Sequence, residues 1–212
     1  ARRHVDALQL GHVATGVGRR AAARGEQQDG QAGDVAERSA GHEIQRCGQA
    51  WQGSPRRRSR RGHVHARALA EQGTPFVFDP GQGLPMFNGD ELKQFIELAT
   101  WITVNDYEGK MLSDRTGWSF EDIASRVRGL IVTLAEHGCE VWEGGQKTVV
   151  PGVKATEVVD PTGCGDAFRA ALLHGLEQGW SLARCAELGN RMGALKIAVR
   201  GPQNYTLVDQ PA

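Results

Sequence analysis

The feature that most constrains this fold is an alternation of short apolar β-type runs with helical patterns, beginning near His65. β-type runs lie at 74–80, 101–105 and 130–138. The segment 89–99 between the first two has apolar residues at helical spacing. Strands that alternate with helices predict an α/β fold with a mostly parallel, doubly wound sheet.

The remainder of the chain continues this pattern. Residues 139–150 predict a hairpin that turns at Gly144 and Gly145. Further helices are expected at 119–127, 166–179 and 181–201, with Ser119 and Ser181 as N-terminal caps. These helices supply the second half of the expected α/β unit.

Residues 1–66 differ sharply in composition from the rest of the chain. They carry 12 Arg, no Lys and 6 acidic residues, and no Phe, Tyr or Met. So few large apolar side chains provide little burial to offset the entropy of ordering the chain. We therefore expect 1–64 to be an Arg/Gly/Ala-rich segment that is disordered or read out of frame, and 65–212 to be the folded part.

Charge and cysteine usage limit the classes of function. The whole chain is neutral, with 25 basic and 25 acidic residues. The Arg-rich run at 54–61 could bind phosphates of nucleic acid without specificity, but Trp51 is the one aromatic residue nearby, so this basic-arm alternative is the weakest. Four scattered cysteines without zinc-ligand spacing favour reduced thiols and a cytoplasmic location. No apolar stretch approaches the length of a membrane span.

The segment VVDPTGCGDAF (158–168) carries the chemistry. A β-type run is expected to reach Asp160, followed by a glycine-rich turn and a helix that starts near Asp166. Backbone N–H groups in such a turn, at the positive end of a helix dipole, favour an anion. Asp166 beside them could accept a proton from an attacking hydroxyl, or could simply cap the helix. The sequence contains no GxxxxGK[ST] phosphate loop.

DPTGCGDAF resembles the second signature of the ribokinase-like (PfkB) kinases, D-T-x-G-A-G-D. Asp160, Gly163, Gly165 and Asp166 match, whereas Pro161 and Cys164 depart from it. The resemblance implies a ribokinase-like fold, represented here in part. It assigns Asp166 as catalytic base and the N–H groups of Gly163, Cys164 and Gly165 as an anion hole.

Other segments resemble the same family in the expected order. NDYE (105–108) is similar to the N-x-x-E motif, which implies that Asn105 and Glu108 organise Mg²⁺ through water. Alone the motif is weak, and Glu108 could be an ordinary solvated helix residue. Two segments resemble nucleotide-lining parts of the family, and they contain the candidate ATP-binding residues Thr133, Gly138, Asn190, Gly193 and Gly201. Gly193 could instead allow close helix packing.

The resemblance implies ATP and Mg²⁺ as cofactors and a small sugar or nucleoside as phosphate acceptor, and it leaves a homodimer open. DPGQGLPMF (79–87) is similar to a bacterial branch described as adenosine kinase-like. The family's glycine motif and acceptor pocket belong to a first half that 1–66 does not resemble. The chain could therefore be an active kinase, or a nucleotide-binding fragment without catalysis.

Overall fold

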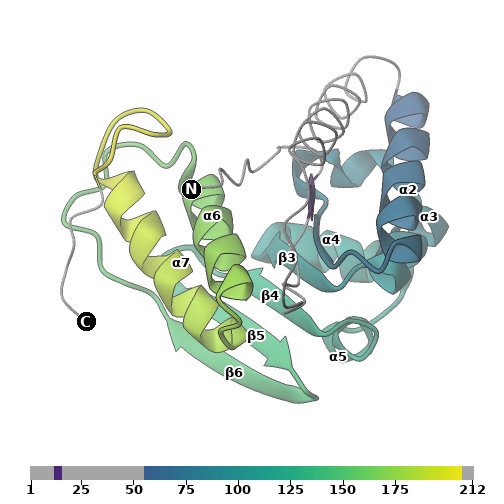
Figure 1. Ribbon diagram of the computed structural model, residues 1–212. Coiled ribbons are helices and arrows are strands. Elements are labelled where there is room, and N and C mark those ends of the chain that lie inside the picture. The colour runs from purple at the N-terminus through teal and green to yellow at the C-terminus, as the bar shows by residue number, and fades with distance from the viewer. Residues whose placement is uncertain (1–11, 16–54, 207–212) are drawn as a thin grey trace, which may run out of the picture.

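The computed structural model describes residues 12–15 and 55–206, and they form one six-stranded sheet in the order β1-β2-β3-β4-β5-β6 (Figure 1). Neighbours in the chain are therefore neighbours in the sheet. The strands are β1 His12–Thr15, β2 Phe76–Asp79, β3 Trp101–Asn105, β4 Gly129–Thr133, β5 Gly138–Glu143 and β6 Gln146–Pro151.

The sheet is mixed. Strands β2, β3 and β4 pair in parallel, and β1–β2, β4–β5 and β5–β6 pair antiparallel. The expected α/β architecture is present, but parallel pairing is confined to the strands that are joined by helical crossovers. The antiparallel pair β5–β6 follows from its short connection, because two residues can join only antiparallel neighbours.

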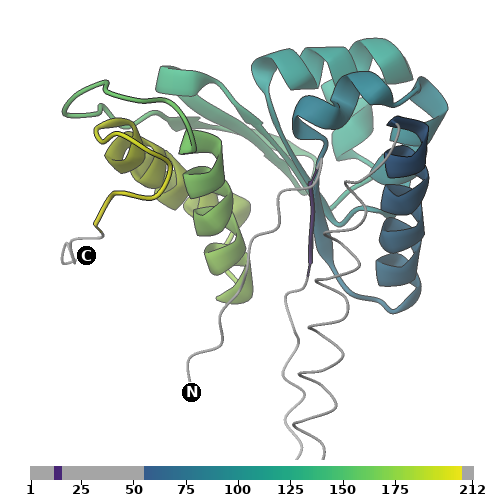
Figure 2. The same ribbon diagram turned by 90° about the horizontal axis from the view of Figure 1, so that it is seen from above.

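Helices cover both faces of the sheet (Figures 1 and 2). α6 and α7 lie together on one face, and α2, α3 and α4 lie on the other. The helices are α2 Pro55–Glu71, α3 Gly89–Leu98, α4 Asp106–Thr116, α5 Phe120–Ala124, α6 Cys164–Glu177 and α7 Leu182–Ile197. Two short 3₁₀ helices, Gly81–Met86 and Ala135–His137, complete the set.

Two apolar cores result from the alternation of side chains along the strands. In β2, Phe76 and Phe78 pack with α3 and α4, whereas Val77 packs with α6 and α7. All three side chains are at most 3% exposed. A strand buried on both faces reads as a continuous apolar run, which is why 74–80 had the pattern of a central strand.

Local signals set the ends of the elements. The Ser119 side chain accepts from the Asp122 N–H at 3.1 Å, and Ser181 caps α7 in the same way, as expected. The hairpin turns at Gly144 and Gly145, with φ of 61° and 77°. Positive φ at both central residues gives the turn twist that suits a hairpin and favours glycine there.

Within residues 1–64 the structure describes the strand β1, His12–Thr15, and the start of α2 at Pro55; residues 1–11, 16–54 and 207–212 lie outside the described residues. Two sequence expectations need correction. No strand forms between Pro151 and Asp160, where the β-type run was expected. That segment follows β6, the edge strand of the sheet, and Val158 is 78% exposed. Its β-branched residues therefore pair with no strand. α6 begins at Cys164, two residues before the expected start.

Within the described residues, no helix has both the length and the apolar character needed to cross a membrane.

Candidate active site

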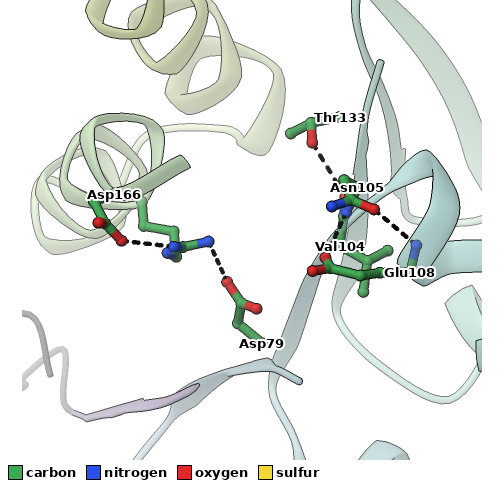
Figure 3. A network of polar contacts seen from close by, with 7 residues as sticks. Asp79, Val104, Asn105, Glu108, Thr133 and Asp166 are labelled. Carbon is green, nitrogen blue, oxygen red and sulfur yellow. Dashed lines mark hydrogen bonds and ion pairs between the residues drawn. The ribbon is translucent and has the colours of Figure 1, made fainter. Parts of the chain in front are cut away.

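The candidate site lies where the three parallel strands end. Asp79, Asn105 and Thr133 are the last residues of β2, β3 and β4. Asn105 pairs directly with Thr133 in the sheet register, and the Thr133 hydroxyl donates to the Val104 carbonyl at 3.4 Å. Open α/β sheets bind ligands outside the carboxyl ends of their parallel strands. In Figure 3 these residues lie across from α6, which carries Asp166.

The turn before α6 has a conformation that requires glycine. Gly163 has φ 86°, and a Cβ at this position would lie 2.9 Å from Pro202 Cβ. The glycine therefore allows both the left-handed backbone and the close approach of the 201–204 loop.

Asp160 ties this turn to the same loop. Its carboxylate accepts hydrogen bonds from the Thr162 N–H at 2.9 Å and the Gly201 N–H at 2.8 Å. These hydrogen bonds lower the pKa of Asp160 to about 2, and the one from the Gly201 N–H has the largest effect. Lys196 is fully buried and donates to the Asp160 carbonyl at 2.7 Å and to the Val199 carbonyl at 3.1 Å. It therefore also connects the turn at Asp160 to the end of α7.

The expected anion hole falls at the start of α6. Cys164 and Gly165 begin α6, so their N–H groups belong to the first turn of a helix, where backbone donors lack partners within the helix. The Cys164 N–H, however, donates to the Pro161 carbonyl at 3.2 Å, so the expected convergence of three N–H groups does not hold for this one. Burial raises the pKa of the Cys164 thiol. Its Sγ lies 3.8 Å from the Gly193 carbonyl of α7.

Asp166 takes part in a chain of charges that reaches the sheet. Its Oδ1 accepts from Arg169 Nη2 at 2.6 Å, and Arg169 Nη1 donates to Asp79 Oδ2 at 2.7 Å. Figure 3 shows the two carboxylates pointing toward each other, one from α6 and one from β2. One guanidinium thus bridges the helix start and the strand end.

Asp79 is the buried member of this chain. Its side chain is 3% exposed, and its Oδ1 has no hydrogen-bond partner among the described residues. Burial raises the pKa of Asp79 to about 6; the Arg169 charge opposes the rise and the Glu108 charge adds to it. A perturbed carboxyl group at a strand end is a candidate functional residue.

Asn105 and Glu108 form a capping box at the start of α4. The Asn105 side chain accepts from the Glu108 N–H at 2.7 Å, and the Glu108 carboxylate accepts from the Asn105 N–H at 2.9 Å. Glu108 is thus more than a solvated helix residue, and Figure 3 shows its carboxylate directed toward Asp79. Among the described residues no group of three or more His, Cys, Asp or Glu side chains is arranged to hold a metal ion. The arrangement fits Mg²⁺ held through water, since this ion keeps most of its water and uses few carboxylates.

The expected ATP-binding residues have different surroundings. Asn190 Nδ2 donates to the Pro151 carbonyl at 3.0 Å, which ties α7 to β6. Gly138 has φ 96°, and a Cβ there would overlap Val150, so close backbone packing accounts for this glycine. A Cβ at Gly193 would meet nothing within 4 Å, so close helix packing does not explain it. Of these glycines Gly193 faces open space, whereas a Cβ at Gly201 would lie 2.8 Å from Asn204 Nδ2.

Three further residues shape this site and were not predicted from the sequence: Arg169, Lys196 and Tyr205. Burial raises the pKa of the Tyr205 hydroxyl, with smaller contributions from the charges of Asp166 and Cys164. A buried lysine leaves no signal in a helical pattern. Arg169 could have been predicted, because it follows Asp166 by three residues and residues three apart on a helix are neighbours.

The family model for pfkB family carbohydrate kinases matches residues 59–209. The chain belongs to the PfkB family, and its fold is ribokinase-like. The match begins six residues ahead of the domain start expected at 65.

Several relatives are nucleoside or sugar kinases. The solved structure of Burkholderia thailandensis nucleoside kinase in complex with inosine is 54% identical, covers 68% of this chain and 48% of that chain, and has a TM-score of 0.66. The Methanocaldococcus jannaschii nucleoside kinase is 32% identical over 59% of this chain and 42% of its own length. The Bacillus subtilis ribokinase is 27% identical over 61% of this chain and 42% of its length. The chain thus spans less than half the length of each of these relatives.

Proposed function

We propose that this protein transfers the γ-phosphoryl group of ATP to a hydroxyl of a small nucleoside or sugar. The observation that carries the proposal is the position of Asp166. Its carboxylate lies in the first turn of α6, after the glycine turn, and faces the ends of the parallel strands. A general base, phosphate-binding N–H groups and a ligand-binding sheet edge therefore meet at one place.

Each group has a role in the reaction. The acceptor hydroxyl oxygen forms a bond to the γ-phosphorus while the bond to the β–γ bridging oxygen breaks, and ADP leaves. Asp166 takes the hydroxyl proton. The N–H groups of Gly163 and Gly165, with that of Cys164 once it releases Pro161, stabilise the charge that grows on the transferred group.

The nucleotide and magnesium are assigned to neighbouring residues. Thr133, Gly193 and the Gly201 turn would line the nucleotide, with Gly138 and Asn190 shaping that wall from behind. Mg²⁺ neutralises phosphate charge during such transfers. Glu108 and Asn105 would hold its water molecules at the end of β3.

We favour a nucleoside as acceptor. The support is the 54% identity to a nucleoside kinase solved with inosine, together with a second nucleoside kinase at 32% identity. The adenosine kinase-like resemblance of residues 79–87 points to the same acceptor class.

The test is a panel of nucleosides and sugars offered to the chain with ATP and Mg²⁺, read by phosphorylated product and by ATP binding. We expect phosphorylated product with at least one nucleoside. We expect ATP to bind whether or not a nucleoside is present. Binding of ATP with no product from any acceptor would favour the nucleotide-binding fragment instead. Absence of both would remove the proposal.

A further inference from the structure

Arg169 is placed where it can control the orientation of Asp166. Its two Nη atoms contact different carboxylates, Asp79 at 2.7 Å and Asp166 at 2.6 Å. A Cβ added at Gly165 would lie 3.3 Å from Arg169 Nη1, so the guanidinium lies against the first turn of α6. A planar fork with both arms engaged has a fixed orientation, which a lysine could not provide.

The contact with Asp79 comes from an unusual carboxylate. Asp79 is 2% exposed at the end of β2, and the nearby negative charge of Glu108 acts against its ionisation. Burying a charge is costly, and Arg169 is the cation that offsets it. Elsewhere α6 packs on the sheet through apolar side chains such as Phe168 and Leu172. A polar link is therefore not needed for packing, which points to a role in the site.

We propose that Arg169 is a positioning residue, anchored by Asp79, that holds the Asp166 carboxylate in one orientation for proton transfer. The inference rests on the proposed phosphotransfer. Arg169 joins the carboxylate of Asp79 to that of Asp166, so the arginine is the link through which Asp79 would act.

Activity gives the first readout. Arg169→Met should lower kcat by about 10²-fold, with the KM for ATP changed by less than about threefold, because misplacement by 1 Å alone costs about that much. Asp79→Asn should lower kcat in the same direction, and Arg169→Lys should recover little, since one ammonium cannot reach both carboxylates in the same geometry. The matched controls are Arg128→Met and Asp114→Asn. Both residues are exposed; Arg128 precedes β4, at the end of that strand opposite Thr133, and Asp114 lies in the last turn of α4. A rise in KM for ATP with unchanged kcat would make Arg169 a phosphate ligand and overturn the proposal.

The second readout does not depend on activity. The ¹³Cγ resonance of Asp166, assigned by its loss in Asp166→Asn, should move or broaden in both Arg169→Met and Asp79→Asn and stay unchanged in the two controls. If the unsubstituted chain transfers no phosphate, the proposed function fails and this spectrum still decides the positioning role. An unchanged Asp166 resonance in Asp79→Asn overturns it, as would full kcat in a folded Arg169→Met variant.

Discussion

The Asp160 carboxylate accepts the Gly201 backbone N–H at 2.8 Å, and this bond joins two segments that lie 41 residues apart. One segment is the turn that leads into α6, and the other is the loop after α7. Because Gly163 of the first packs against Pro202 of the second, the bond fixes both walls of the candidate phosphate site. Asp160 thus acts as a structural residue of the signature, rather than as a catalytic one.

Replacing this carboxylate should loosen both segments. In Asp160→Ala we expect the Gly201 and Thr162 amides to exchange hydrogen about tenfold faster or more, because each loses a charge-assisted bond. The pKa of Asp160 is lowered to about 2, so its contribution is fully present above its ordinary value of 3.8 and is lost as pH falls through about 2. The measurement is the hydrogen exchange rate of the Gly201 and Thr162 amides. Glu157→Gln, an exposed neighbour, is the control, and equal exchange in both variants would contradict the assignment.

Asp79 should give stability the opposite pH dependence. Its pKa is about 6 in the folded chain against 3.8 ordinarily, so between these values the folded state binds more protons than the unfolded state. Stability should therefore fall as pH rises from about 4 to 6, by about 3 kcal/mol at most for a two-unit shift. Arg169 from α6 and Glu108 from α4 are the charged groups that face it.

The measurement is the free energy of unfolding in urea at pH 4.5 and pH 7. Asp79→Asn should remove most of the difference between the two values, whereas Asp114→Asn should keep it. An identical pH dependence with and without the Asp79 carboxyl would assign the effect to another group.

Asp166→Asn tests the proposed base. Asparagine keeps the shape but cannot take the proton, so phosphoryl transfer in a single turnover should fall by about 10²–10⁴-fold. Nucleotide affinity should stay near its starting value, because the phosphate-binding donors are backbone groups that survive the change. Transfer at the original rate would remove Asp166 from the mechanism, and lost ATP binding would make it part of the nucleotide site.

Two glycines of α7 should respond oppositely to enlargement. A Cβ at Gly189 would lie 2.5 Å from the Phe168 ring, so Gly189→Ala should cost about 1–3 kcal/mol of stability. Gly193 faces open space, so Gly193→Ala should stabilise the helix by roughly 0.5–1 kcal/mol. Gly193→Leu should then weaken ATP binding roughly tenfold, about 1.4 kcal/mol, without lowering the melting temperature. Calorimetry measures the ATP affinity, and an unchanged affinity in Gly193→Leu would place the nucleotide elsewhere.

Local patterns in the sequence determined much of this protein. Apolar runs gave the central strands, Ser119 and Ser181 gave helix starts, and two glycines gave the hairpin turn, because each signal acts within a few residues. The GCGD turn before α6 is local in the same sense. Family membership followed from such short signatures, which do not need the rest of the fold to be recognised.

The tertiary structure alone decided which distant groups meet. Asp79 and Arg169 are 90 residues apart, and only the packing of α6 across the end of β2 brings them to 2.7 Å. Burial raises the pKa of Asp79, and Lys196 is held by its hydrogen bond to the Asp160 carbonyl. Neither effect can be predicted from the residues next to Asp79 or Lys196 in the sequence. The same holds for the exposed segment 152–160, where a β-type sequence formed no strand because the sheet had already ended at β6. Hydrogen bonds, burial and charge act through space, so a sequence pattern specifies the residues and the fold specifies their partners.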